Sequence, residues 1–279
     1  MKKCIIIIPI YKKTLANEEQ QSLEQCLKIL GDYPIKFICS NNLDTINYEN
    51  FLKLTSCDFS FVRFDNKYFK SVKNYSKLLL KEKFYMNFTD YEFMLIYQLD
   101  AWVFENKLNY WCDKNYDYIG APWFEGYDLA TSKSELLPIA GNGGFSLRKI
   151  SSILKVLNKD YREPKSFKYI YEHSSKRKKI SKIINIPIYL YRFIFQMAHY
   201  FPLWQITELY EDMVFARYGQ KAYKDFRLAP PEVALQFSFE TQPRRLYAMN
   251  KNKLPFGCHA FEKYDFNFWK QFITAEKVF

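Results

Sequence analysis

The sequence predicts an α/β fold in which a mainly parallel central sheet carries helices on both faces. The stretch from Cys4 to Ile10 is a continuous, mostly β-branched run, which is typical of a central strand covered on both sides. Short apolar runs then alternate with longer helical patterns, as expected for a parallel sheet. Hydrophobic residues make up 48% of the chain and charged residues 25%, so a large core is available. One domain spanning residues 1–279 accommodates these features.

The elements follow from local signals along the chain. Gly31 ends the first helical pattern, and the polar turn from Ser40 to Asn42 ends the second strand. The expected elements after the first strand are, in order, a helix from about Asn17 to Leu30, a strand from Ile35 to Cys39, a strand from Phe59 to Phe64, a helix from Asn74 to Lys83 and a strand from Phe93 to Tyr97.

Glycine clusters in the middle of the chain. Residues Gly141 to Gly144 hold three of only eight glycines, which favours a loop where the backbone closely approaches another group. Its amides would then be free to meet sugar hydroxyls or phosphate, whereas the alternative is a tight turn before a strand. The sequence contains no dinucleotide-binding or P-loop glycine motif.

The segment 172–202 differs in composition from the rest. A basic run is followed by nearly twenty residues rich in Ile, Tyr and Phe, interrupted by Pro187 and Arg192. An arginine at the centre of a membrane span is unfavourable by roughly 2.5–3.5 kcal/mol, so we expect a helical insertion lying on an anionic membrane surface through residues 176–201. A solvated loop followed by a core helix is the alternative. The basic residues are Lys176, Arg177, Lys178, Lys179 and Lys182.

Charge and cysteine usage restrict the class of protein. The net charge of +11 indicates an anionic partner, but most lysines are scattered and no nucleic-acid-binding module is visible, so no nucleic acid is expected as a partner. The six cysteines form no metal-ligand spacing, and the N-terminal apolar run is short, contains Pro9 and lacks a cleavage site. These features favour reduced thiols in the cytoplasm.

Polar residues at strand ends are the candidate binding residues. Pro9 and Tyr11 end the first strand, Asn41 follows the second, and Asp100 follows the strand ending at Tyr97. Ligands of α/β sheets bind at this edge, where Asp100 would meet a ribose or a metal bridging a diphosphate. A simple turn carboxylate is the other interpretation of Asp100.

Two further positions carry candidate chemistry. Glu211 and Asp212 begin an amphipathic pattern, so they either cap a helix N-terminus or supply a general base, for which Asp212 is the candidate. His259 lies among aromatic residues, where a histidine is either a packing residue or a metal ligand.

Five motifs occur in order: Tyr-Gln-Leu-Asp-Ala, Tyr-Ile-Gly-Ala-Pro-Trp, Gly-Asn-Gly-Gly-Phe-Ser-Leu-Arg, Glu-Asp-Met-Val-Phe and Gly-Cys-His-Ala-Phe. Together they resemble an uncharacterised family of transferases of the GT-A type, a Rossmann-like fold, found in bacterial capsule and lipopolysaccharide loci. The resemblance covers roughly residues 1–160 and 203–265 and leaves the basic-aromatic insertion outside. The glycine-rich octapeptide is its most specific part.

The resemblance implies roles for individual residues. Asp100 would take the first position of the Asp-x-Asp motif, Asp212 beside Glu211 would be the catalytic base, and His259 the metal-binding histidine. Trp102 stands where the second aspartate, the usual metal ligand, is expected, which leaves the need for Mn²⁺ or Mg²⁺ open. Arg148 would then neutralise the leaving diphosphate.

The implied activity is transfer of a sugar from a nucleotide-sugar donor to a glycan or lipid-linked glycan, such as a lipopolysaccharide, O-antigen or capsule precursor. Asp212 as base favours inversion, although retention stays open. The enzyme would be peripheral, at the inner face of the bacterial cytoplasmic membrane. A relative that binds the donor without transfer, and a basic anion- or nucleic-acid-binding protein, are the alternatives. The expected donor-binding residues are Pro9, Tyr11, Asn41, Asp100, Gly143, Gly144 and Arg148.

Overall fold

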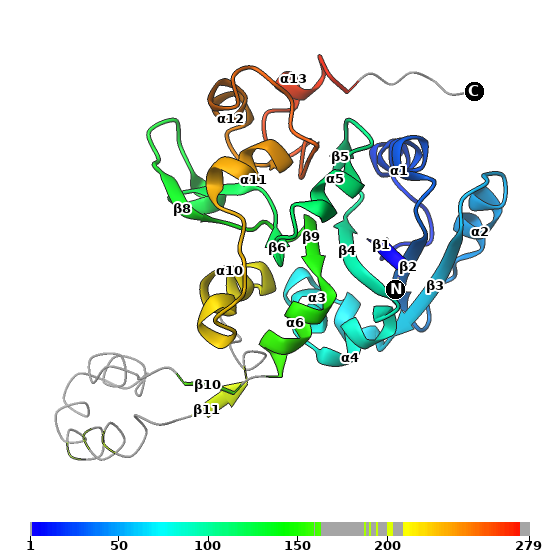
Figure 1. Ribbon diagram of the computed structural model, residues 1–279. Coiled ribbons are helices and arrows are strands. Elements are labelled where there is room, and N and C mark those ends of the chain that lie inside the picture. Colours follow the sequence, from blue (N-terminus) through cyan, green and yellow to red (C-terminus); the bar gives the residue numbers. More distant parts are fainter. Residues whose placement is uncertain are drawn as a thin grey trace.

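The computed structural model describes residues 2–158, 160–162, 200–202 and 209–273, together with positions 187, 190 and 194. At its centre lies a six-stranded sheet in the order β3-β2-β1-β4-β9-β6 (Figure 1). The first four of these strands run parallel, and β9 is antiparallel to both of its neighbours. The predicted α/β fold with a mainly parallel sheet is therefore confirmed. The strands are β1 (Lys2–Pro9), β2 (Ile35–Ser40), β3 (Phe59–Phe64), β4 (Tyr91–Tyr97), β6 (Tyr118–Ile119) and β9 (Phe145–Lys149).

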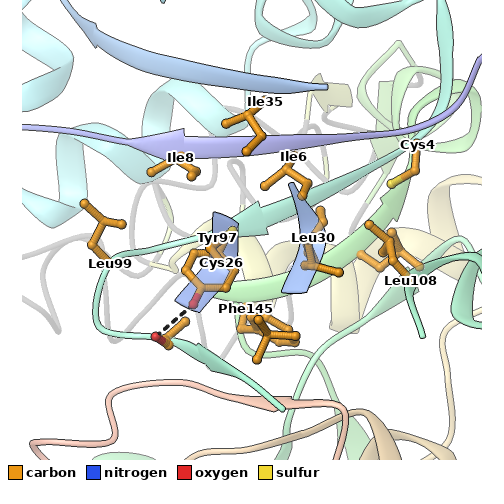
Figure 2. Packing of buried hydrophobic residues seen from close by; sticks show 14 of the residues in the cluster. Cys4, Ile6, Ile8, Cys26, Leu30, Ile35, Tyr97, Leu99, Leu108 and Phe145 are labelled. Atoms are coloured by element: carbon orange, nitrogen blue, oxygen red, sulfur yellow. Dashed lines mark hydrogen bonds between the residues drawn. The ribbon is translucent and has the colours of Figure 1, made fainter. Parts of the chain in front are cut away.

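Helices cover both faces of this sheet because successive β1 side chains point to opposite sides. Ile6 and Ile8 pack with Cys26 and Leu30 of the first helix in one hydrophobic cluster, which Figure 2 shows. Ile5 and Ile7 belong to a second cluster on the other face. The first face carries α1 (Asn17–Leu30), α2 (Ile46–Leu52) and α5 (Leu108–Asp113), and the second carries α3 (Val72–Leu79), α4 (Glu82–Tyr85), α6 (Ile150–Leu157) and α10 (Glu211–Ala222).

One expected helix has different bounds. The pattern from Asn74 to Lys83 forms α3 and α4 instead of a single helix. α3 begins earlier because the Ser71 hydroxyl accepts a hydrogen bond from the Asn74 amide and caps the helix. Near its end, the buried Tyr85 hydroxyl donates to the Leu79 carbonyl, so a side chain takes the place of the next helical amide.

A smaller three-stranded sheet, β12-β13-β5, lies beside the main one. Its strands are only two residues long, yet they join chain segments that are far apart in sequence. They are β5 (Trp102–Val103), β12 (Ser238–Phe239) and β13 (Gly257–Cys258), and the surrounding elements are β7 (Pro122–Phe124), η3 (Tyr127–Leu129), β8 (Leu136–Ala140), α11 (Pro231–Phe237), α12 (Pro243–Met249) and α13 (Phe266–Trp269).

The expected insertion at 172–202, with its membrane contact at 176–201, lies outside the described residues apart from a few positions. Its flanks are described: β10 (Asp160–Arg162) pairs antiparallel with β11 (Tyr200–Pro202). The chain therefore leaves and re-enters the fold at adjacent points. Among the described residues, no helix is both long enough and apolar enough to span a bilayer.

Candidate active site

The expected residues at the strand ends share one edge of the sheet, because the carboxyl ends of parallel strands lie together. Pro9 is the buried last residue of β1, and Tyr11 beyond it is 45% exposed and contacts the rings of Phe69 and Tyr75. Desolvation, and then the charges of Asp100 and Glu211, raise the pKa of Tyr11. Tyr11 and Asp100 thus lie near each other.

Asn41 occupies the same edge beyond β2. Its amide donates to the Phe64 carbonyl at 2.9 Å, and its carbonyl accepts from the Arg63 guanidinium at 3.1 Å. Asn41 as a residue is exposed. Its backbone is therefore held while its side chain remains available to a ligand.

Strand register brings His259 to the same place. β13 pairs antiparallel with β5, with Cys258 opposite Trp102, so His259 lies beside the turn that contains Asp100. β12 runs parallel to β13, which sets Glu240 next to His259 on the other side. The imidazole Nε2 lies 3.2 Å from Asp100 Oδ1, and Nδ1 lies 2.9 Å from Glu240 Oε1.

The two carboxylates hold this imidazole in its protonated form. Desolvation by itself lowers the pKa of His259, but Asp100 and Glu240 outweigh it and raise the pKa to about 10. Desolvation likewise opposes ionisation of Asp100, yet the His259 charge brings the pKa of Asp100 below its usual value. Lys263, an exposed cation, acts on the pKa of Asp100 in the same direction.

The residue at the expected position of the second aspartate of the Asp-x-Asp motif is Trp102. Trp102 is buried in β5 with its ring edge-on to Phe261 at 5.8 Å, so its side chain does not face the site. Instead the amide oxygen of Gln98 lies 3.2 Å from His259 Nε2. The side chains that approach His259 Nε2 are therefore those of Gln98 and Asp100, which lie two positions apart in sequence. The Tyr-Gln-Leu-Asp-Ala motif already contained this pair.

A divalent cation fits these residues by chemistry. Among the described residues, no three or more His, Cys, Asp or Glu side chains are arranged to hold a metal ion. The amide oxygen of Gln98, however, joins Asp100 Oδ1 and His259 Nε2, and oxygen ligands with one imidazole suit Mn²⁺ or Mg²⁺. Loss of the Nε2 proton would free that nitrogen, while Glu240 would keep the Nδ1 proton and orient the ring.

The glycine loop between β8 and β9 turns its polar groups inward. The Gly143 amide donates to Asp212 Oδ2 at 3.1 Å, and the Gly144 amide donates to the Asn142 side chain at 3.0 Å. Asn142 also donates from its side chain to Glu240 Oε1 at 2.7 Å. The expectation that these glycine amides meet a ligand directly is therefore corrected: they are bound to site carboxylate and amide oxygens.

The two adjacent glycines are required by close approach. A Cβ atom on Gly144 would overlap the His259 imidazole, and one on Gly143 would lie 2.7 Å from Glu211 Oε1. Both glycines thus let charged side chains contact the main chain directly. This explains why the glycine cluster belongs to the site even though its amides are occupied.

Asp212 lies in the first turn of α10, which begins where the Glu211 amide donates to the Ser76 hydroxyl at 2.7 Å. Its Oδ1 accepts from the Met213 amide and its Oδ2 from the Gly143 amide. The residue is partly exposed. Desolvation, followed by the charge of Glu211, raises the pKa of Asp212 to about 8.

Two expected site residues do not face a ligand. Arg148 on β9 is completely buried, and its Nη2 lies 3.0 Å from Glu211 Oε1, so the guanidinium cannot reach a diphosphate outside. Glu211 is 6% exposed and is bound to that cation, so its carboxylate is not placed as a base. The donor-binding role of Arg148 and the catalytic role of Glu211 are therefore corrected.

Sequence patterns did not reveal Gln98, Asn142 and Glu240 as site residues. Gln98 and Glu240 are brought to His259, and Asn142 to Glu240, by contacts between distant segments. The single local signal was the position of Gln98 and Asp100 in the turn directly after β4, at the carboxyl edge of the sheet.

The chain is thus an α/β protein in which polar and charged side chains gather at the carboxyl edge of a mainly parallel sheet, where α/β folds bind ligands. The chain belongs to the family described as protein of unknown function DUF5672, whose model matches residues 58–259. None of the curated proteins matches the chain.

Solved structures similar to this chain include several glycosyltransferases. Mouse xyloside xylosyltransferase 1, in its apo form, is 10% identical with a TM-score of 0.49, and the match covers 92% of this chain and 97% of that one. The galactosyltransferase LgtC, in complex with donor and acceptor sugar analogs, is 12% identical with a TM-score of 0.48, covering 99% and 97%. Core-mannan synthase A from Aspergillus fumigatus, in a Mn/GDP form, is 12% identical with a TM-score of 0.33, and the match spans 45% of this chain and 43% of that one. At these values the likeness concerns overall fold alone.

Proposed function

We propose that the chain is a glycosyltransferase that moves a sugar from a nucleotide-sugar donor to a hydroxyl group of an acceptor glycan. The placement of Asp212 carries the proposal. A partly exposed carboxylate with its pKa raised to about 8 lies across the glycine loop from Asp100 and His259. A base with a pKa near the working pH is suited to take a proton from an attacking hydroxyl.

The residues divide the reaction between them. Asp212 accepts the proton of the acceptor hydroxyl as its oxygen bonds to the anomeric carbon, and the bond to the diphosphate breaks with its electron pair leaving on the diphosphate. Attack from the face opposite the leaving group inverts the configuration. Bound to Gln98, Asp100 and His259, Mn²⁺ or Mg²⁺ would supply Lewis-acid stabilisation of the diphosphate charge. Lys263 adds positive charge on the exposed side of Asp100.

The nucleoside end of the donor is assigned to the ends of β1 and β2. Tyr11 offers an exposed aromatic ring and Asn41 an exposed polar side chain at that edge, and Pro9 ends β1 two residues before Tyr11. Aromatic faces and amide groups are the usual means of binding a base. The identity of the base and of the sugar is left to the experiment below.

The acceptor proposed is a lipid-linked or surface glycan precursor of a bacterial envelope, as the sequence resemblance implies. Three described positions of the insertion, Pro187, Leu190 and Ile194, are helical and exposed. The side chains of Leu190 and Ile194 are 48% and 58% exposed. Exposed apolar side chains that follow a basic run in the sequence support attachment to an anionic membrane surface, proposed as the inner face of the cytoplasmic membrane.

Turnover of candidate donors tests the proposal. Purified protein is incubated with UDP-, GDP-, CMP- and dTDP-sugars in the presence of Mn²⁺, Mg²⁺ or EDTA, and release of the nucleotide is measured. One donor is expected to be hydrolysed slowly, and Asp212→Asn is expected to lower that rate by about 10²- to 10⁴-fold. Donor affinity measured by calorimetry should stay within a few-fold.

Asp117→Asn is the matched control. Asp117 is also a buried carboxylate, but it lies directly before β6 and binds Ser152 and the Arg227 amide, not the glycine loop. Its replacement should leave donor turnover unchanged in folded protein. Full activity in Asp212→Asn would remove Asp212 as the base.

A second candidate is a relative that binds the donor without transferring the sugar. The observation that favours it is the burial of Trp102, which leaves the Gln98 side-chain amide, and not a second carboxylate, beside Asp100 at His259 Nε2. Calorimetric binding of one donor, with no product from any acceptor tested, would select this reading.

A further inference from the structure

A buried ion pair lies beneath the glycine loop. The Arg148 side chain is 0% exposed and the Glu211 side chain 7%, and Nη2 lies 3.0 Å from Oε1. Other N–H groups of the same guanidinium donate to the Tyr85 hydroxyl at 3.0 Å, the Ser146 hydroxyl at 3.1 Å and the Gly143 carbonyl at 3.3 Å. A buried pair of this kind is stable only when its hydrogen bonds are satisfied, as they are here.

This pair holds Asp212 by two routes. The first is covalent, since Glu211 precedes Asp212 in the first turn of α10. The second passes through Gly143, whose carbonyl accepts from Arg148 and from Ser146 while its amide donates to Asp212 Oδ2. A change in the pair therefore moves the carboxylate of Asp212.

The pair also sets the charge around Asp212. After desolvation, the Glu211 carboxylate is the largest influence that raises the pKa of Asp212, and Glu240 acts in the same direction. Arg148 opposes them, and the Tyr118 phenol is also in electrostatic contact with Asp212. The Glu211 carboxylate does not reach a ligand, yet among the neighbouring charges it has the largest effect on the pKa of Asp212.

We infer that Glu211 is a positioning residue, which together with Arg148 holds Asp212 in place and keeps it a strong enough base to accept the proton of the acceptor hydroxyl. The inference rests on the proposed function, because that function makes Asp212 the base. Arg148 supplies the counter-charge for the buried Glu211 side chain. The glycine loop is the mechanical link between the pair and the base.

An activity-independent experiment measures the protonation of Asp212 through stability. Its pKa in the folded chain is above the unfolded value of about 3.9, so the native state binds this proton more tightly. Stability from this group is present at low pH and is lost as pH rises toward about 8. The Tm of Asp212→Asn minus that of the unmodified protein should therefore grow as pH rises from about 3.9 and level off near pH 8. We call this pH range the titration window of Asp212.

The same pH series is then repeated in a Glu211→Gln background. With the neighbouring charge removed, the upper end of the window should move to lower pH by about one unit or more. Glu211→Asp, which keeps the charge, should move it less. Asp117→Asn, which removes a buried carboxylate elsewhere, should leave it in place.

Glu211→Gln leaves Arg148 buried without its partner and risks misfolding. The double variant Arg148→Met with Glu211→Gln removes both charges and avoids that problem. Its window should end between those of the unmodified protein and of Glu211→Gln, because the two charges act on Asp212 in opposite directions. An unchanged window in both backgrounds would overturn the inference.

Enzyme rates provide the second arm. With the donor that is turned over, the rising limb of the pH–rate profile should shift to lower pH in Glu211→Gln, at a plateau several-fold lower because the base is weaker. A purely structural role would lower stability and leave the limb in place. Absence of turnover by the unmodified protein would count against the proposed function alone, since the Tm series still reports on Glu211.

Discussion

Arg148 carries its positive charge on the inner side of the glycine loop, where water does not reach. Alternation along β9 accounts for this position: Phe145 and Leu147 point into the core cluster shared with α1, and Ser146 and Arg148 point to the opposite face. On that face the guanidinium meets two tyrosine hydroxyls and one carboxylate. The residue therefore organises the site from below.

Replacing Arg148 with Met is expected to lower the free energy of unfolding by about 3–5 kcal/mol, because Glu211 is left buried without a counter-charge. Urea unfolding followed by circular dichroism measures the loss. Arg244→Met is the matched control, since the Arg244–Asp265 pair has an exposed arginine and should contribute little to stability. Equal losses in the two variants would contradict a specific role for burial.

At the scale of the elements, the site is assembled by strand register. Two-residue strands suffice, because β5 and β12 flank β13 and set Asp100 and Glu240 on either side of His259. The backbone amide of Gln98 donates to the Gly144 carbonyl at 2.9 Å. This hydrogen bond continues the pairing of β4 with β9 past the end of the sheet. The register of these short strands therefore fixes the positions of site residues as firmly as that of the long central strands does.

Local patterns were enough to predict the central elements. The helix from Asn17 to Leu30 and the strand from Phe59 to Phe64 were predicted with their bounds, because capping and apolar runs are encoded by neighbouring residues. The partners of His259 were not predicted beyond Asp100, because Gln98 lies 161 residues away in sequence. Which strands pair, and in which register, is decided by packing of the whole chain.

Gly144→Ala tests the contact between the glycine loop and β13. The added methyl group overlaps the His259 imidazole, so the ring must move. We expect donor turnover to fall by about 100-fold and unfolding free energy by about 1–3 kcal/mol. Rates and urea unfolding of the purified variant provide both numbers.

Combining Gly144→Ala with His259→Ala separates the clash from other effects. Removing the imidazole makes room for the methyl group, so the double variant should be more stable than the sum of the two single losses implies. Activity should stay low, since His259 is absent. Strictly additive losses in stability would show that Gly144 is required for some reason other than the imidazole.

For the whole molecule, the proposed membrane contact is separable from the site. Replacing the five basic residues of 176–182 with glutamine should weaken binding to vesicles containing anionic lipid by at least about 100-fold, because each contributes about 1 kcal/mol near such a surface. Co-sedimentation at physiological salt measures this, and binding to neutral vesicles should be weak throughout. Turnover of a soluble donor should not change.

The control variant removes the same charge elsewhere. Lys53, Lys70, Lys73, Lys224 and Lys251 are exposed and lie outside the insertion. Their replacement by glutamine should leave vesicle binding nearly intact. Equal loss in both variants would indicate that overall charge, and not the segment, draws the protein to the lipid.

The pairing of β10 with β11 also bears on how such a chain diversifies. Because the segment 163–199 starts and finishes at neighbouring positions, its length and composition are free to drift without changing the path of the sheet or of α10. Relatives that share the fold are expected to differ most between these two strands. Exchange of this segment between relatives is expected to change the surface that the protein binds and to leave the rest of the fold unaltered.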